Sequence, residues 1–282
     1  MRFSRNLGLL TDTQQEQLHA SKVVVSGVGG MGGVAAEALV RMGIGSLFIL
    51  DHDKYEISNI NRQIHCTDHA IGRKKVDVIG EKLLSINPSL KLSKCDSLNK
   101  HNVSEIISNA DVVINGMDDI KASIILEREA RRQGKTIVDA WITPYASVFV
   151  ITPESPHWEE FLKFPTLTKA IDEITKADIE KCLRLEVKFT LSQFNPTEII
   201  SEQLIEEILS GKRSRPSLAP VVWLSGTLMA NEAMKYLTKQ GRLATHWGVF
   251  YNQYDHEIKY IDMWGKEEKS HANQFNHYKL AG

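Results

Sequence analysis

The hydrophobic pattern of the first 140 residues alternates between two kinds of segment. Short apolar runs, many of them β-branched, predict strands at residues 23–26, 47–50, 90–95, 112–114 and 136–139. Between them, apolar residues at helical spacing predict helices at residues 34–42, 73–85 and 123–132. This alternation is typical of an α/β protein with a doubly wound parallel sheet.

The pattern changes after residue 140. An apolar run predicts a strand at 145–152, whereas residues 166–217 are charged and helical only in places. A long apolar stretch at 218–237 contains Asn231, Glu232 and Lys235, which favours a core helix with one wet edge over a membrane span. Residues 248–251 and 257–261 predict an antiparallel hairpin. We therefore expect parallel strands, later antiparallel strands, and a helical crossover insertion between them.

Composition excludes several classes of protein. The 34 Lys and Arg residues balance 35 Asp and Glu residues, so no global field attracts nucleic acid or an anionic membrane. The three cysteines, Cys66, Cys95 and Cys182, form no CxxC pair, which argues against a disulfide framework and a four-thiolate structural zinc site. Without a signal-like start or an uncharged apolar span, we expect a cytoplasmic protein with no membrane contact.

A glycine turn follows the first predicted strand. Gly27, Gly29, Gly30 and Gly32 form a GxGxxG sequence between that strand and the next helix, as in Rossmann-like folds. Such a turn lets the backbone approach a phosphate chain at a helix N-terminus. The alternative is tight strand–helix packing without a ligand. Asp51 ends the second strand, where an acidic side chain accepts hydrogen bonds from the ribose of either NAD or ATP.

Polar residues after Asp51 narrow the choice of nucleotide. Asn59, Arg62, Gln63 and Lys75 follow within one stretch, and the two cations suit a triphosphate better than a dinucleotide. Attack of a carboxylate on the α-phosphorus of ATP builds charge on phosphoryl oxygens, which needs several cations. For Lys75 alone, a solvated surface charge would be the better interpretation, but the grouping favours phosphate contacts.

Two acidic residues follow the strand predicted at 112–114. Asp118 and Asp119 lie where ligands collect in open α/β sheets, at the carboxyl ends of the strands. One carboxylate there suits Mg²⁺, which binds through one or two carboxylates and substrate phosphates. The alternative is a helix N-cap. Both roles fit if Asp118 is the metal ligand and Asp119 the cap.

Taken together, the glycine turn, Asp51, residues 58–63, residues 72–75 and Asp118 resemble the ThiF/MoeB/HesA (ubiquitin-activating-enzyme-like) adenylyltransferase family. The resemblance covers about residues 1–150 and returns at 218–237. It implies a homodimer or pseudo-dimer in which ATP and Mg²⁺ activate a carboxylate as an acyl-adenylate with release of pyrophosphate. The substrate is usually the C-terminus of a small protein or peptide.

The resemblance also implies an organisation and a set of site residues. Residues 1–282 would form one adenylation domain, with a nucleotide-binding core at 1–150, a crossover and specificity insertion at 151–217, a core helix and hairpin at 218–265, and a polar tail at 266–282. The implied ATP-binding residues are Gly27, Gly29, Gly30, Gly32, Asp51, Asp53, Asn59, Arg62, Gln63 and Lys75. Asp118 would associate with Mg²⁺, and Arg5 would reach the nucleotide of the neighbouring subunit.

Two departures from the family pattern concern cysteine. Many relatives have two CxxC pairs for structural zinc, and this chain has none. Relatives that pass the acyl group to a thiol place a cysteine in the crossover region, where Cys182 is the candidate. We favour a small apolar residue on a helix for Cys182, although Lys181 and Arg184 would favour a thiolate if the side chain were exposed.

Other functions compete with this interpretation. The same activation chemistry would serve a small molecule, or tRNA threonylcarbamoyl-adenosine with later cyclisation or dehydration. Residues 61–65 are compatible with this tRNA-modifying branch. We expect residues 212–215 to form an exposed basic turn, which offers a local contact. An NAD(P) oxidoreductase fits the glycines and Asp51 but leaves Arg62, Lys75 and Asp118 unexplained. A nucleotide-binding partner subunit without catalysis is disfavoured by the same three residues.

Overall fold

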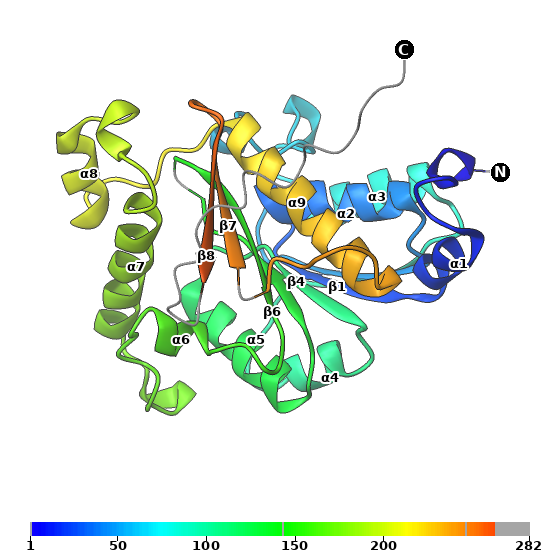
Figure 1. Cartoon of the computed structure of the whole chain (residues 1–282), viewed down its shortest axis with the longest axis horizontal. Coiled ribbons are helices and arrows are strands. Elements are labelled where there is room, and N and C mark those ends of the chain that lie inside the picture. Colours follow the sequence, from blue (N-terminus) through cyan, green and yellow to red (C-terminus); the bar gives the residue numbers. More distant parts are fainter. Residues whose placement is uncertain (1, 143, 246, 263–282) are drawn as a thin grey trace, which may run out of the picture.

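A mixed β-sheet organises the molecule, and helices cover both of its faces (Figure 1). Over the residues that this computed structural model describes, 2–142, 144–245 and 247–262, the sheet has eight strands in the order β3-β2-β1-β4-β5-β6-β7-β8. The strands are β1 (Lys22–Ser26), β2 (Ser46–Leu50), β3 (Lys91–Cys95), β4 (Val112–Asn115), β5 (Ile137–Asp139), β6 (Ala146–Ile151), β7 (Trp247–Asn252) and β8 (Glu257–Asp262). The strands from β3 to β5 pair in parallel, and β6, β7 and β8 continue the sheet antiparallel.

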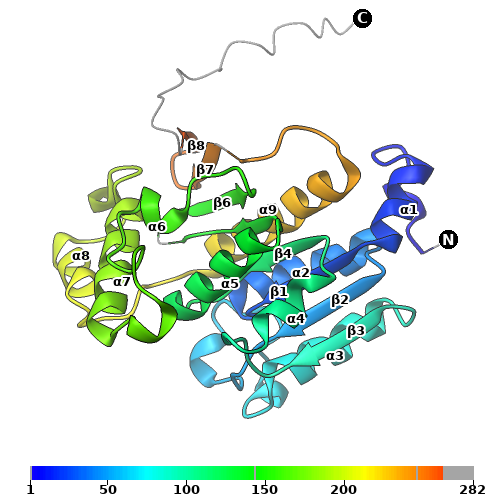
Figure 2. The same ribbon diagram turned by 90° about the horizontal axis from the view of Figure 1, so that it is seen from below.

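The helices divide between the two faces and the crossover region (Figures 1 and 2). They are α1 (Asp12–Ala20), α2 (Gly30–Met42), α3 (Lys75–Ile86), α4 (Val103–Ser108), α5 (Ile120–Arg132), α6 (Trp158–Phe161), α7 (Lys176–Leu191), α8 (Glu202–Leu209) and α9 (Ala219–Thr238). Helices α2, α3 and α9 share one core with the sheet, and α4 and α5 build a second core on the opposite face. The expected fold class is therefore confirmed.

Three helices were not predicted: the short α4 and α6, and α1, whose apolar signal is weak. Helix α1 buries one residue, Leu18, and begins with a capping box in which the Thr11 side chain accepts from the backbone N–H of Gln14. Helix α4 spans only six residues. The polar tail expected at 266–282 lies outside the described residues, and the proposed division into four parts stays a prediction.

The crossover region forms three helices that pack beside the antiparallel half of the sheet (Figure 1). The longest, α7, begins at a capping box between Thr175 and Asp178. An aromatic core joins the region to the sheet, with Trp141 lying 4.5 Å from Phe149 and 5.9 Å from Trp158 between ring centroids. Residues 151–217 are thus fixed to the core rather than appended to it. Within the described ranges, every helix is too short or too polar to cross a bilayer.

Helix α2 begins at Gly30, four residues before the predicted start, because glycines allow it to pack closely. A Cβ on Gly226 of α9 would lie 2.5 Å from the Met31 carbonyl oxygen and 2.8 Å from the Cβ of Val34. Real Cβ atoms do not approach backbone this closely, so the approach of α9 to α2 at this point requires glycine. This contact fixes the start of α2 relative to the sheet.

We expect Gly226→Ala to lower the free energy of unfolding by about 1–3 kcal/mol, as overpacking of a core usually does. Alanine gains about 1 kcal/mol of helix propensity over glycine, but the clash is with backbone that does not yield easily. Thr227→Ala, on the exposed side of the same helix turn, is the control and should change stability by less than about 0.5 kcal/mol. Denaturant unfolding of both variants measures this, and an unchanged midpoint for Gly226→Ala would contradict the packing argument.

Candidate active site

A cleft of about 820 Å³ opens at the carboxyl ends of the parallel strands. It lies where the strand order reverses between β1 and β4, the place at which open α/β sheets bind ligands. The glycine turn and the ends of β2 and β4 line one part of it. Helix α7 and the segment between α8 and α9 line another. The cleft therefore joins the parallel part of the sheet to the crossover region.

The glycine turn is required mainly by packing. Gly27 has a φ of +81°, and a Cβ there would lie 2.7 Å from the backbone of Gly116 at the end of β4. A Cβ on Gly32 would lie 1.8 Å from the Gly27 carbonyl oxygen, and one on Gly30 would lie 2.4 Å from Val222 of α9. Gly29 differs, since its nearest neighbour would be the Gln63 amide at 3.6 Å. Packing thus brings the uncapped start of α2 to the edge of the cleft.

Asp51 ties the end of β2 to the glycine turn. Its carboxylate accepts from the backbone N–H of Val28 at 3.0 Å and from that of Asp53 at 2.9 Å. Burial raises the pKa of Asp51, and the charge of Lys75 opposes this effect. Asp51 lines the cleft at the expected position, and the ribose contact remains a prediction.

Lys75 is buried at the start of α3. Its Nζ lies 2.8 Å from Asp53 Oδ2, and the lysine side chain is only 7% exposed. A solvated surface charge is therefore wrong as an interpretation of Lys75. Both residues line the cleft, so the cation already has a protein counterion where we expect a phosphate. His52 Nε2 lies 3.2 Å from the other Asp53 oxygen, and Asp51, His52 and Asp53 bring one polar side-chain atom each within 4.8 Å of one another.

Three residues of the polar run after Asp51, namely Asn59, Arg62 and Gln63, were predicted to contact the nucleotide, and two of them line the cleft. Arg62 is half-buried there and donates to the Ser58 carbonyl and to Asn61 Oδ1, both at 2.9 Å. Gln63 is buried beside Gly29, and its Oε1 has no hydrogen-bond partner among the described residues. The side chain of Asn59 is absent from the residues that line the cleft. Its Oδ1 accepts instead from the backbone N–H of Glu56, in a local turn.

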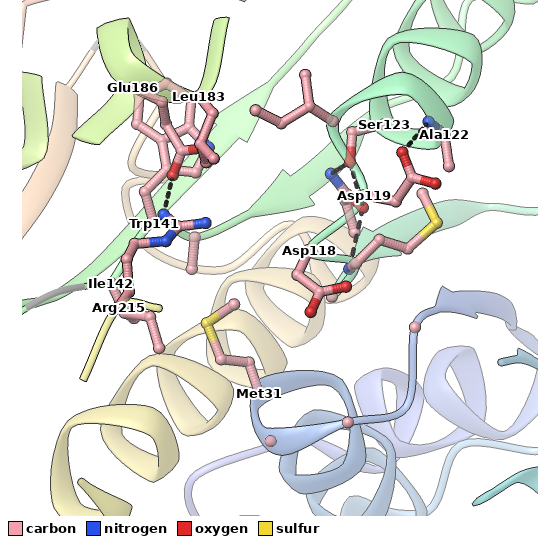
Figure 3. A pocket seen from close by; sticks show the side chains of 18 of the residues that line it. Met31, Asp118, Asp119, Ala122, Ser123, Trp141, Ile142, Leu183, Glu186 and Arg215 are labelled. Atoms are coloured by element: carbon pink, nitrogen blue, oxygen red, sulfur yellow. Dashed lines mark hydrogen bonds and ion pairs between the residues drawn. The ribbon is translucent and has the colours of Figure 1, made fainter. Parts of the chain in front are cut away.

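The two acidic residues after β4 have different environments (Figure 3). Asp119 caps α5 by accepting from the backbone N–H of Ala122 at 3.1 Å, as one of the two interpretations expected. Asp118 is exposed and lines the cleft, and its carboxylate has no partner among the described residues. Asp118 is therefore free to ligate a cation, which is the role we predict for it.

Two predicted residues lie outside the cleft. Arg5 is exposed on the short helical turn Ser4–Asn6, so any contact with a nucleotide requires a second subunit. Cys182 is fully buried in the aromatic core, 3.9 Å from Thr166 Oγ1, and burial raises the pKa of its thiol to about 11. An acyl-accepting thiol must reach the cleft, and in this structure Cys182 does not. The small apolar interpretation agrees with its burial.

The sequence interpretation missed a buried pair at the ends of β4 and β5. Asn115 Nδ2 donates to Asp139 Oδ2 at 3.0 Å, and the backbone N–H of Ala140 donates to Oδ1 at 2.7 Å. Burial raises the pKa of Asp139 to about 7, against the lowering effect of the Asn115 hydrogen bond. Both residues line the cleft. The rule that pointed to Asp118 would have found them, since both end strands of the parallel sheet.

The crossover side of the cleft carries a second charged pair (Figure 3). Arg215 Nη1 lies 2.6 Å from Glu186 Oε1, with the glutamate side chain 6% exposed. The residues 212–215 were expected as an exposed basic turn, and this is wrong for Arg215. Its guanidinium is drawn into the cleft by a buried carboxylate, next to the apolar side chains of Trp141 and Leu183.

The chain is similar in sequence to known proteins. The family model described as ThiF family matches residues 3–272. The tRNA threonylcarbamoyladenosine dehydratase of Bacillus subtilis (strain 168) is 33% identical over 140 residues, covering 49% of this chain and 55% of the relative. The molybdopterin-synthase adenylyltransferase of Haemophilus influenzae is 30% identical over 154 residues, covering 53% and 63%. The chain thus spans less than two thirds of the length of these curated relatives.

Solved structures share the fold at lower identity. E. coli MccB with MccA-N7isoASN superposes with a TM-score of 0.66 and 20% identity, covering 89% of this chain and 66% of that one. PaaA superposes with a TM-score of 0.65 and 20% identity, covering 89% and 75%. At such identities, the likeness concerns the fold.

The raised pKa of Asp139 predicts a pH dependence of stability. Because the folded pKa is about 7 and the unfolded value about 3.8, the stabilisation is complete below pH 4 and is lost as the pH rises through 7. We expect wild type to lose roughly 1–3 kcal/mol more than Asp139→Asn between pH 5 and pH 8. Denaturant unfolding at several pH values measures the difference. Asp118→Asn, which removes an exposed carboxylate from the same cleft, is the control; equal slopes for wild type and Asp139→Asn would refute the assignment.

Proposed function

Since the chain belongs to the ThiF family, we propose that its cleft binds ATP with Mg²⁺ and adenylates a carboxylate, releasing pyrophosphate. The observation that carries this proposal is the convergence of Arg62, Gln63, Lys75 and Asp118 on one cleft from separate segments. A dinucleotide oxidoreductase needs one phosphate-facing turn and gives no role to these residues. They also count against a partner subunit without catalysis.

The residues at this end of the cleft fit a triphosphate. Gln63 lines the cleft and its amide nitrogen can donate to a phosphate oxygen, and Lys75 presents a buried cation held by Asp53. The start of α2 supplies backbone N–H groups and a positive dipole end. The carboxylate of Asp118 would hold Mg²⁺, which neutralises phosphate charge when bound. Arg62 and Lys75 would then balance the charge that develops on the phosphoryl oxygens.

The reaction requires alignment more than acid–base chemistry. A carboxylate substrate is already ionised at neutral pH, so it attacks the α-phosphorus without a general base. Its oxygen bonds to phosphorus while the bond to the pyrophosphate oxygen breaks, and pyrophosphate leaves with the electron pair. The protein then has to hold both reactants in line and keep water away.

The substrate we favour is the C-terminus of a small protein or peptide, as the similarity to molybdopterin-synthase adenylyltransferase supports. The alternative is a tRNA threonylcarbamoyl-adenosine or a small molecule, which the similarity to the dehydratase of Bacillus subtilis supports. Within the run 61–65 that suggested tRNA, His65 is buried and bonds to Glu37 of α2 at 2.8 Å. Only Arg62 and Gln63 of that run line the cleft, and both serve the nucleotide end in our proposal.

A homodimer is part of the proposal. Two segments that hydrogen-bond to each other beside the cleft carry exposed apolar side chains. These side chains are 38–70% exposed and belong to Ile57, Ile60, Ile64, Leu218 and Trp223. Exposed apolar patches of this kind mark contact surfaces. A second copy covering this patch would complete the site with Arg5. Action in the cytoplasm and the absence of structural zinc remain predictions.

We expect Arg62→Ala and Asp118→Ala each to lower carboxylate-dependent exchange of pyrophosphate into ATP by about 10²–10³-fold, since each removes charge stabilisation from the transition state. A screen of peptide C-termini and small acids for pyrophosphate release identifies the carboxylate to use. Arg73→Ala is the matched control, because Arg73 lies outside the cleft and pairs with Glu81. Unchanged exchange in either cleft variant would remove that residue from the mechanism.

The dimer proposal has its own test. Arg5→Ala and Arg62→Ala proteins should each be inactive alone, because each lacks one half of a composite site. Mixing them under conditions that exchange subunits should restore exchange to about a quarter of the wild-type rate per protein, since half the dimers are mixed and each holds one intact site. Analytical ultracentrifugation checks the dimer itself, and a monomer with full activity would rule out a role for Arg5 across subunits.

A further inference from the structure

The crossover half of the cleft contains two buried carboxylates that its proposed substrate must accommodate. Asp139 and Glu186 are both buried and both line the cleft. Arg215 neutralises Glu186 at 2.6 Å. Asp139 receives only neutral donors, the Asn115 amide and the Ala140 N–H. No cation among the described residues makes an ion pair or hydrogen bond with Asp139.

A carboxylate entering this half meets a like charge. Two ionised carboxylates in a buried site repel each other, and one of them then holds its proton more tightly. Three arginines, Arg184, Arg213 and Arg215, line this side; none is paired with Asp139 in the described structure, and Arg215 is already engaged with Glu186. The repulsion is relieved if the substrate brings its own hydrogen-bond donor to Asp139.

The surroundings of Asp139 indicate what kind of donor fits. Trp141 and Ile142 follow Asp139 in the chain and line the same half of the cleft, together with Leu183 and Val187 of α7. An apolar wall makes it costly to strip water from a free ammonium group. A neutral amide N–H loses less on desolvation and still donates to an ionised oxygen. An ionised carboxylate also keeps acceptor capacity beyond the two hydrogen bonds it already receives.

We propose that Asp139 is a specificity residue that selects carboxylate substrates carrying an amide N–H next to the carboxyl-bearing carbon, as a peptide C-terminus does. This inference rests on the proposed adenylation and adds the residue that selects its substrate. The raised pKa of Asp139 agrees with it, because burial without a cationic partner leaves the anion short of donors. A substrate N–H supplies the missing donor and places the adjacent carboxylate within the cleft.

The test compares two acids that differ by one atom. Acetyl-glycylglycine is the first probe, and its ester analogue, with oxygen in place of the last N–H, is the second. In pyrophosphate exchange, wild type should prefer the amide by about ten- to hundred-fold in kcat/KM, the range expected for a hydrogen bond to a charged group. The preference should fall to less than about threefold in Asp139→Ala and to an intermediate value in Asp139→Asn, with the KM for ATP unchanged.

Glu232→Gln is the matched control. Glu232 is also buried, but it lies outside the cleft on α9 and pairs with Lys235, so its variant should keep the wild-type preference. If Asp139→Ala does not fold, Asp139→Asn decides, since retention of the full preference there overturns the inference. Equal use of both probes by wild type also overturns it.

The remaining outcomes separate the inference from the proposed function. Exchange that is supported by other acids but by neither probe overturns the selection for an N–H while adenylation stands. Exchange that is supported by no acid in the screen removes adenylation and the inference together.

Discussion

The close approach of backbone to backbone at the glycine turn is the constraint on which the rest of the structure depends. Gly27 packs against Gly116, and Gly32 packs against the Gly27 carbonyl. Gly226 of α9 packs against the backbone of Met31 in α2. A single Cβ at any of these positions would push α2 away from the sheet. The position of α2 sets the edge of the cleft, and with it the distance between the strand ends and the crossover helices. The same glycines that suggest a phosphate site in the sequence are therefore first a packing device.

Two cations of the cleft are already paired before any ligand arrives. Lys75 is held by Asp53 and Arg215 by Glu186, while Asp118 and the oxygen of Gln63 have no partner among the described residues. Buried charges persist only when they are paired, so these protein counterions keep the cations in place. The unpaired groups then mark where a ligand has most to contribute. Asp118 and Gln63 are therefore candidate ligand-binding residues, whereas Asp53 and Glu186 orient the cations that they pair with.

Much of the fold follows from the sequence, and the failures have local causes. The parallel core, the late hairpin and α9 are predicted because long or β-branched apolar runs encode them directly. Helix α1 is missed because a capping box rather than an apolar face specifies it. In the site, Asp118 and Lys75 are found from motif order, whereas Asp139 and Glu186 are not. Asp139 ends a strand and could have been found by the rule that pointed to Asp118, but its burial and the pairing of Glu186 with Arg215 depend on neighbours that only the folded chain brings together.

Asn59 and Arg215 both show where prediction from the sequence fails: Asn59 was predicted to line the site and does not, whereas Arg215 was not predicted and does. Asn59 belongs to the motif, yet its side chain closes a local turn. Arg215 belongs to a run that reads as exposed and basic, yet a buried glutamate on another helix draws it inward. Spacing in the sequence cannot distinguish these cases, because the partner that decides each one lies in three-dimensional contact rather than in the motif.

The segment between α8 and α9 connects the two ends of the cleft mechanically. It carries Arg215, its Ser217 carbonyl accepts from Asn61, and Trp223 of the helix it enters donates to the Arg62 carbonyl. A ligand that displaces Arg215 therefore pulls on the same backbone that positions Arg62. Thermodynamic linkage makes such coupling reciprocal. If a ligand at one end of the cleft changes the affinity for a ligand at the other end, the second ligand changes the affinity for the first by the same factor.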